Sequence, residues 1–133
     1  MKKLISLLLA LVLIIAMAVP AFAMTSTTQE KERTKNYTVG NNTYTCVYSA
    51  TANTSKATAT ITLPRTGVNI SANIGVTISK ANSTPYSREV GDIGNLKVSV
   101  SITAPGTTVD GKITYARATY TAFNDYVDAF TFY

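Results

Sequence analysis

The sequence predicts an all-β protein, a small antiparallel β-sandwich of about seven strands after an N-terminal signal peptide. From residue 37 onward, apolar and polar residues alternate with a period of two, which is typical of strands with one buried and one solvated face. Thr, Val, Ile and Tyr, which suit a pleated surface, are frequent in these stretches, and Gly, Pro, Asn and Asp interrupt them at short intervals. A small β-barrel is the alternative, because the same pattern of short strands also occurs in barrels.

The first 23 residues have the three parts of a secretory signal. Lys2 and Lys3 precede an apolar run over 4–19, and an A-x-A box follows at 21–23. We expect cleavage after Ala23, in the manner of a bacterial Sec signal. The mature chain would then be secreted, extracellular or held at the cell surface, with no membrane span left after cleavage.

The mature chain begins with a polar segment, residues 24–36, that has no apolar period and mixes both signs of charge. We expect a disordered leader here, ahead of a single sandwich domain over 37–133; a short binding arm is the alternative. Removal of Lys2 and Lys3 lowers the formal net charge from +5 to +3. Because the remaining basic residues are scattered, the sequence predicts no nucleic-acid partner.

Turn signals separate the expected strands. The first pair meets at 40–42, the next connections fall at 53–55 and 64–67, and a last tight turn is expected at Asn124-Asp125. Residues 112–123 and 126–133 close the chain as less regular, aromatic-rich strands. The apolar rows expected to face the core are Tyr44, Cys46, Tyr48, Ala50 and Ala52; Ala57, Ala59, Ile61 and Leu63; Val68, Ile70, Ala72, Ile74, Val76 and Ile78; and Leu96, Val98, Val100 and Ile102.

One connection, residues 80–95, is longer than most loops of a compact domain. We interpret it as a crossover between sheets, with a binding loop as the alternative. Tyrosine combines apolar area with a polar tip and suits contacts with proteins or sugars. The candidate partner-binding residues are therefore Tyr86, Arg88, Glu89 and Asp92 in this connection, and Tyr126 and Tyr133 near the C-terminus.

The composition excludes several chemistries. The chain has no His, which excludes Ser-His-Asp and Cys-His triads and His-ligated zinc. Its one cysteine, Cys46, excludes an internal disulfide; we expect it in the core, with pairing between two chains as the alternative. The few carboxylates lack the dense spacing of calcium loops. The sequence therefore predicts a protein that is not an enzyme and has no metal or cofactor.

Residues 63–67 read LPRTG, which resembles a sortase cell-wall sorting signal. In that family an apolar span and a basic tail follow the pentapeptide at the C-terminus, whereas here expected strands follow it. A strand, a proline turn and a second strand account for the same letters.

Three functions remain open from the sequence. The first is a secreted or cell-surface protein that acts by binding an envelope polymer, another protein or a copy of itself. The second is a secreted antimicrobial β protein: the aromatic last strand, over 126–133, and the small exported chain are similar in composition to β-sandwich bacteriocins of the lactococcin group. The third is a small hydrolase, which the missing histidine disfavours.

Overall fold

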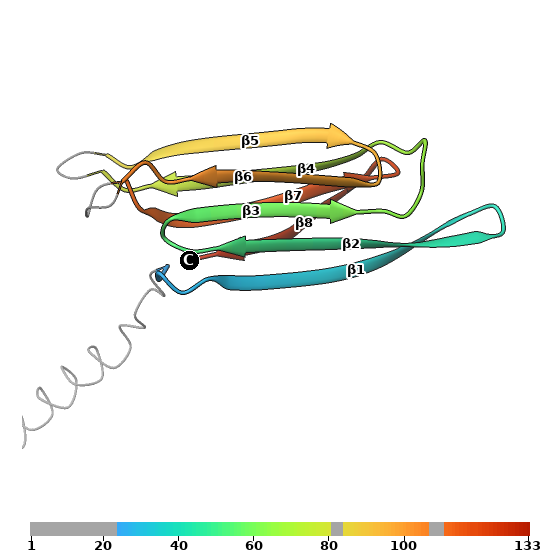
Figure 1. Ribbon diagram of the computed structural model, residues 1–133, viewed down its shortest axis with the longest axis horizontal. Helices are drawn as coiled ribbons and strands as arrows, with labels where there is room; N and C mark the ends of the chain where they lie inside the picture. The colour runs from blue at the N-terminus through green and yellow to red at the C-terminus, as the bar shows by residue number, and fades with distance from the viewer. Residues whose placement is uncertain (1–23, 81–83, 107–110) are drawn as a thin grey trace, which may run out of the picture.

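The chain forms a two-layer antiparallel β-sandwich (Figure 1). The computed structural model describes residues 24–80, 84–106 and 111–133, so the predicted signal peptide lies outside the described residues. Over those three ranges no helix occurs that could cross a membrane. The strands are β1 (Gln29–Val39), β2 (Asn42–Ala52), β3 (Lys56–Thr62), β4 (Ile70–Ile78), β5 (Tyr86–Gly94), β6 (Lys97–Thr103), β7 (Ile113–Ala122) and β8 (Asp125–Phe132).

One sheet has the order β1-β2-β3-β6 and the other the order β5-β4-β7-β8. The chain changes sheet after β3, after β5 and after β6, while short turns join β1 to β2 and β7 to β8 within a sheet. The predicted sandwich is confirmed and the barrel is not, because each sheet keeps two separate edges. The edge strands β5 and β1 lie at the upper and lower margins of Figure 1.

The core lies between the sheets and consists of the alternate apolar residues of the inner strands. The rows predicted on β2, β3, β4 and β6 are buried almost throughout. The rings of Tyr48 and Tyr120 meet between the layers, with centroids 5.2 Å apart. Tyr120 Oη donates a hydrogen bond to the Ser49 carbonyl at 2.6 Å, which gives a buried phenol the partner that it needs. Cys46 is a free, fully buried cysteine of this core.

The prediction of a disordered leader is wrong for residues 29–36, which belong to β1 and pair with β2 along its whole length. The inner face of β1 carries long cations instead of apolar residues. The Lys31 ammonium lies 4.8 Å from the Phe132 ring centroid, and the Arg33 guanidinium lies 6.0 Å from that of Phe130. The charged ends of both side chains therefore lie over aromatic rings of β8, and the Lys31 ammonium also donates a hydrogen bond to the Thr131 carbonyl.

The prediction of a long connection over 80–95 is wrong for residues 86–94, which form β5. This strand lies at a sheet edge and is exposed on both faces, so it needs no apolar alternation. The turn into β6 contains Leu96, which has a φ of 66° and is exposed rather than part of the core row. The last turn lies one residue earlier than predicted, at Phe123-Asn124, where φ values of 50° and 59° match a two-residue hairpin turn.

Candidate functional site

The outer face of the β5-β4-β7-β8 sheet contains a groove of about 610 Å³. The other layer covers the inner face of this sheet, so the groove is open to solvent. The groove is lined by Asn73, Gly75, Val76 and Thr77 of β4, by Ser87, Arg88 and Glu89 of β5, by Tyr115, Arg117 and Thr119 of β7, and by Tyr126 of β8.

The depth of the groove follows from a glycine in the middle of the sheet. Gly75 of β4 pairs with Glu89 of β5 on one side and with Arg117 of β7 on the other. Residues directly opposite one another point to the same face, so these three positions form one outward row. A Cβ at Gly75 would meet no atom within 4 Å, so the sheet is open between the acidic and the basic side chain.

Hydrogen-bonding groups surround this depression. The Asn73 side-chain amide donates to Glu89 Oε1, which fixes the orientation of the amide because the reverse orientation would bring two oxygens together. Asn73 Oδ1 is buried and has no hydrogen-bond partner among the described residues. A donor from a bound molecule would satisfy this acceptor.

Aromatic rings flank the polar floor. Tyr115 and Tyr126 line the groove, and the Tyr115 ring makes an edge contact with Tyr133, with centroids 5.6 Å apart. Tyr126 and Tyr133 are 62% and 61% exposed, so their rings are available to a partner. The groove thus combines flat apolar rings with planar polar side chains.

The structure brings together part of the candidate set from the sequence. Arg88, Glu89 and Tyr126 line the groove, and Tyr133 contacts its wall through Tyr115. Tyr86 and Asp92 lie on β5 but do not line the groove. Sequence reasoning did not select the other eight lining residues, which are Asn73, Gly75, Val76, Thr77, Ser87, Tyr115, Arg117 and Thr119.

One signal in the sequence could have located the groove. Gly75 interrupts an outward row of Ser71, Asn73 and Thr77 in an otherwise regular strand. A glycine inside a strand pattern often marks a place where another molecule or backbone approaches closely. The polar residues around it could not be told from an ordinary solvated sheet face.

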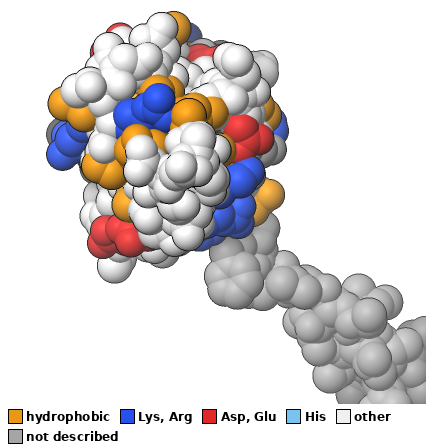
Figure 2. All heavy atoms as spheres, turned by 90° about the vertical axis from the view of Figure 1, so that its right-hand side faces the viewer, with side chains coloured by type: hydrophobic (Ala, Val, Ile, Leu, Met, Phe, Trp, Pro, Cys, Tyr) orange, Lys and Arg blue, Asp and Glu red, His pale blue; other side chains and the backbone are white. Residues whose placement is uncertain are grey.

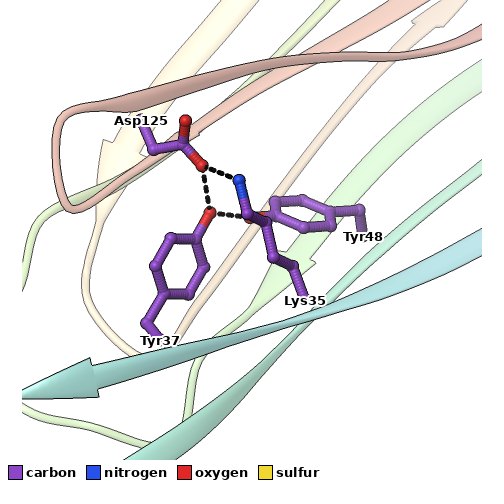
Figure 3. Close-up of polar contacts among 4 residues, drawn as sticks. All are labelled: Lys35, Tyr37, Tyr48 and Asp125. Atoms are coloured by element: carbon purple, nitrogen blue, oxygen red, sulfur yellow. Dashed lines mark hydrogen bonds and ion pairs between the residues drawn. The ribbon is translucent and has the colours of Figure 1, made fainter.

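A second polar cluster joins the two sheets near the β7–β8 turn (Figure 3). Tyr37 Oη donates to Asp125 Oδ2 at 2.8 Å, and the Lys35 ammonium lies 2.5 Å from the same oxygen. Because the Tyr37 hydroxyl donates its proton to the carboxylate, Tyr48 Oη is the donor in its hydrogen bond with Tyr37 Oη, which is 2.5 Å long. Lys35, Tyr37 and Tyr48 come from the β1-β2 pair and Asp125 comes from β8, so the cluster ties one layer to the other.

The protonation states of this second cluster favour a structural role. Burial raises the pKa of Tyr37 to about 12, and burial together with the hydrogen bond to Tyr37 raises the pKa of Tyr48 further. The hydrogen bonds from Lys35 and Tyr37 lower the pKa of Asp125. Near neutral pH both phenols therefore keep their protons, and the cluster offers no phenolate nucleophile.

The LPRTG segment forms the β3–β4 connection at the same end of the sandwich. The Arg65 guanidinium lies 4.9 Å from the Tyr44 ring centroid and 5.8 Å from that of Phe123. Figure 2 looks onto this end and shows basic and hydrophobic side chains next to one another. Arg65 here packs on aromatic rings within the fold, which supports the interpretation of the segment as a turn between strands.

Within the three described ranges, no group of three or more His, Cys, Asp or Glu side chains is placed to hold a metal ion. The fold and the groove define the chain as an antiparallel β-sandwich with a mixed polar and aromatic groove on one outer face. No protein-family model, curated protein or solved structure matches the chain.

Proposed function

We propose that the mature chain is a secreted or cell-surface protein that acts by binding, without catalysis, and that its groove binds a hydroxyl-rich polymer of the cell envelope that carries acidic groups. The observation that carries this proposal is the glycine-centred groove on the outer face of the β5-β4-β7-β8 sheet. The signal peptide expected from the sequence supplies the route out of the cytoplasm.

The lining of the groove supports a polyhydroxylated ligand. Tyr115 and Tyr126 offer flat rings for the apolar faces of sugars, while Asn73 and Glu89 offer the planar polar groups that hydroxyls bind. Asn73 Oδ1 is buried and has no hydrogen-bond partner in the part of the chain that the structure describes, which favours a ligand that brings hydrogen-bond donors.

The charges support acidic groups on that ligand. Arg117 lies in the outward row beside Gly75 and lines the groove, and Glu89 accepts a hydrogen bond from Asn73. A guanidinium presents a planar fork that matches carboxylate and phosphate oxygens. The net positive charge of the mature chain acts in the same direction at longer range.

Two observations favour binding over hydrolysis. Among the described side chains that line the groove, Glu89 is the one carboxylate, whereas glycoside hydrolysis ordinarily needs two. In the second cluster, burial raises the pKa of Tyr37 and of Tyr48, which disfavours a phenolate nucleophile there.

The test is to fill the groove without altering the rest of the fold. Gly75→Tyr places a ring in open space, and we expect it to fold normally and to lose most binding of residues 24–133 to separated bacterial envelope fractions. Thr58→Tyr is the matched control, because it adds the same ring to the outer face of the opposite sheet. Equal binding by both variants would remove the groove from the proposal.

The salt dependence of parent binding separates a built site from general attraction. We expect saturable binding to one fraction that weakens but persists at about 1 M salt, where the screening length is about 3 Å. Binding that disappears under these conditions would show that only the positive charge of the chain is at work. No binding to any fraction would overturn the proposal as a whole.

A further inference from the structure

The strand β5 presents an unpaired backbone edge to solvent. It pairs with β4 on one side only, and it is exposed along nearly its whole length. Tyr86, Val90 and Ile93 are large hydrophobic residues that are 38%, 36% and 69% exposed on this strand. A free edge of this kind is a template for a strand from another chain.

Symmetry restricts how two copies can pair antiparallel along β5. A two-fold axis perpendicular to the sheet must place residues of the same face opposite one another, so the sequence numbers of opposite residues sum to an even value. One residue therefore lies directly opposite its own copy, and the axis passes between these two copies. An axis at Arg88, Glu89 or Asp92 would place two like charges directly against each other, which is destabilising.

An axis at Val90 gives a self-complementary register. Tyr86–Gly94 is centred on Val90, so this register pairs the strand from end to end. It places Arg88 opposite Asp92 of the second copy, and by symmetry Asp92 opposite the second Arg88. Within one chain these two residues are four positions apart, about 13 Å along a strand, so they cannot pair with each other.

The remaining positions also fit. Val90 meets its own copy at the axis, and Tyr86 lies opposite Gly94, where an aromatic ring can cover the missing side chain. Glu89 lies opposite Gly91, so its carboxylate meets no like charge. An axis at Gly91, by contrast, pairs Val90 with Asp92 and leaves Arg88 opposite Gly94.

Two other edges of the described fold do not offer this match. The charged segment of β1 runs from Glu30 to Lys35, and a two-fold axis at any of its residues places like charges opposite one another. The pairing of β7 with β8 has a register shift between Ala118 and Thr119, and such irregularities disfavour the addition of a further strand.

We propose that β5 is a homodimerisation edge, and that two copies pair antiparallel with Val90 on the two-fold axis to form one continuous sheet. The partner is a second copy of this chain, and Arg88 and Asp92 set the register. This inference goes beyond the proposed function and does not depend on any ligand.

The test measures the oligomeric state of residues 24–133 by sedimentation velocity over a range of concentrations. Arg88→Glu and Asp92→Arg each place like charges opposite one another at two symmetric positions, and we expect each to weaken the dimer about ten-fold or more. The double variant Arg88→Glu/Asp92→Arg restores opposite charges and should recover the dimer. Both changed residues are on an exposed strand, so thermal melts should show that all three variants stay folded.

The register has its own measurement. Val90→Cys places two thiols opposite each other at the axis, so a disulfide-linked dimer should form under mild oxidation. Glu89→Cys is the control, because its thiol lies opposite Gly91, and the native Cys46 is buried. A parent that stays monomeric at all concentrations, a charge swap that fails to recover the dimer, or equal cross-linking at both positions would overturn the proposal.

Discussion

Tyr37 shows how one side chain can link the two layers of this sandwich. It lies near the end of β1, its ring stacks against Phe123 with centroids 4.9 Å apart, and its hydroxyl donates to Asp125. Phe123 is one of two residues with positive φ in the β7–β8 turn. The ring contact and the hydrogen bond together hold that turn against the β1-β2 hairpin.

The raised pKa of Tyr37 predicts a stability loss in alkali. An unfolded tyrosine has a pKa of about 10, so the free energy of unfolding is unaffected below that pH and falls as pH rises toward the folded pKa of about 12. At pH 8, Tyr37→Phe should cost about 1 kcal/mol, because it removes the hydrogen bonds to Asp125 and Tyr48. The difference between parent and variant should shrink as pH rises from 10 to 12.

Urea unfolding followed by circular dichroism at a series of pH values measures both parts of this prediction. Tyr133→Phe is the control, because it removes a phenol whose residue is 61% exposed. A difference between the parent and Tyr37→Phe that stays constant from pH 8 to 12 would contradict the expected link between the Tyr37 proton and folding.

At the scale of the strand, the two faces of β1 differ in what they contribute. The outward residues Glu30 and Glu32 are exposed, whereas Lys31 and Arg33 lie over the rings of Phe132 and Phe130. The double change Lys31→Ser/Arg33→Ser should lower the free energy of unfolding by about 1–3 kcal/mol, because it removes two cations that lie over buried rings and the hydrogen bond from Lys31 to the Thr131 carbonyl.

The control for this prediction is Glu30→Ser/Glu32→Ser, which changes the same strand on its solvated face. We expect that change to stay within about 0.5 kcal/mol of the parent. Urea unfolding of both variants compares the two faces directly. If neither double change affected stability, residues 29–33 would behave as the solvated leader that the composition alone suggests.

The same comparison explains which strands the sequence could predict. Alternation appears where one face of a strand is buried, so the core rows of β2, β3, β4 and β6 could be assigned residue by residue. The inner face of β1 carries Lys and Arg in place of apolar residues, and β5 is exposed on both faces, so neither strand shows that alternation. The missed strands are edges, where burial is weakest.

The candidate site was predictable to a similar extent. Arg88, Glu89 and Tyr126 could be selected because a long connection and a chain end draw attention to polar and aromatic residues. Tyr115 and Arg117 could not, because pairing between β4 and β7 decides that they meet Gly75. The alternation of residues within one strand does not show which residues of a distant strand will lie opposite them.

At the scale of the whole molecule, the two open sides of the sandwich differ in how far side chains cover them. On one side, cations of β1 cover the aromatic residues of β8, and the salt bridge from Lys35 to Asp125 joins the sheets. On the other side, β5 stays exposed beside β6. Both proposals depend on this exposed strand: β5 is the proposed dimer edge, and its residues Ser87, Arg88 and Glu89 also line the groove.

If both proposals hold, the dimer should bind a long polymer more tightly than the monomer does. A two-fold axis perpendicular to the sheet places both grooves on the same face of the continuous sheet, where one chain of ligand can engage both. Val90→Lys should break the dimer at its axis without altering the groove, because Val90 is not among the lining residues. The concentration for half-saturation of the envelope fraction should then rise about ten-fold or more.

Short fragments released from the same envelope fraction provide the control, since they can fill one groove at a time. Parent and Val90→Lys should bind them equally, because the variant keeps every lining residue and its added charge would, if anything, favour an acidic ligand. An equal loss for fragments and polymer would mean that β5 itself contacts the ligand. An unchanged affinity for the polymer in a variant shown to be monomeric would mean that each groove acts alone.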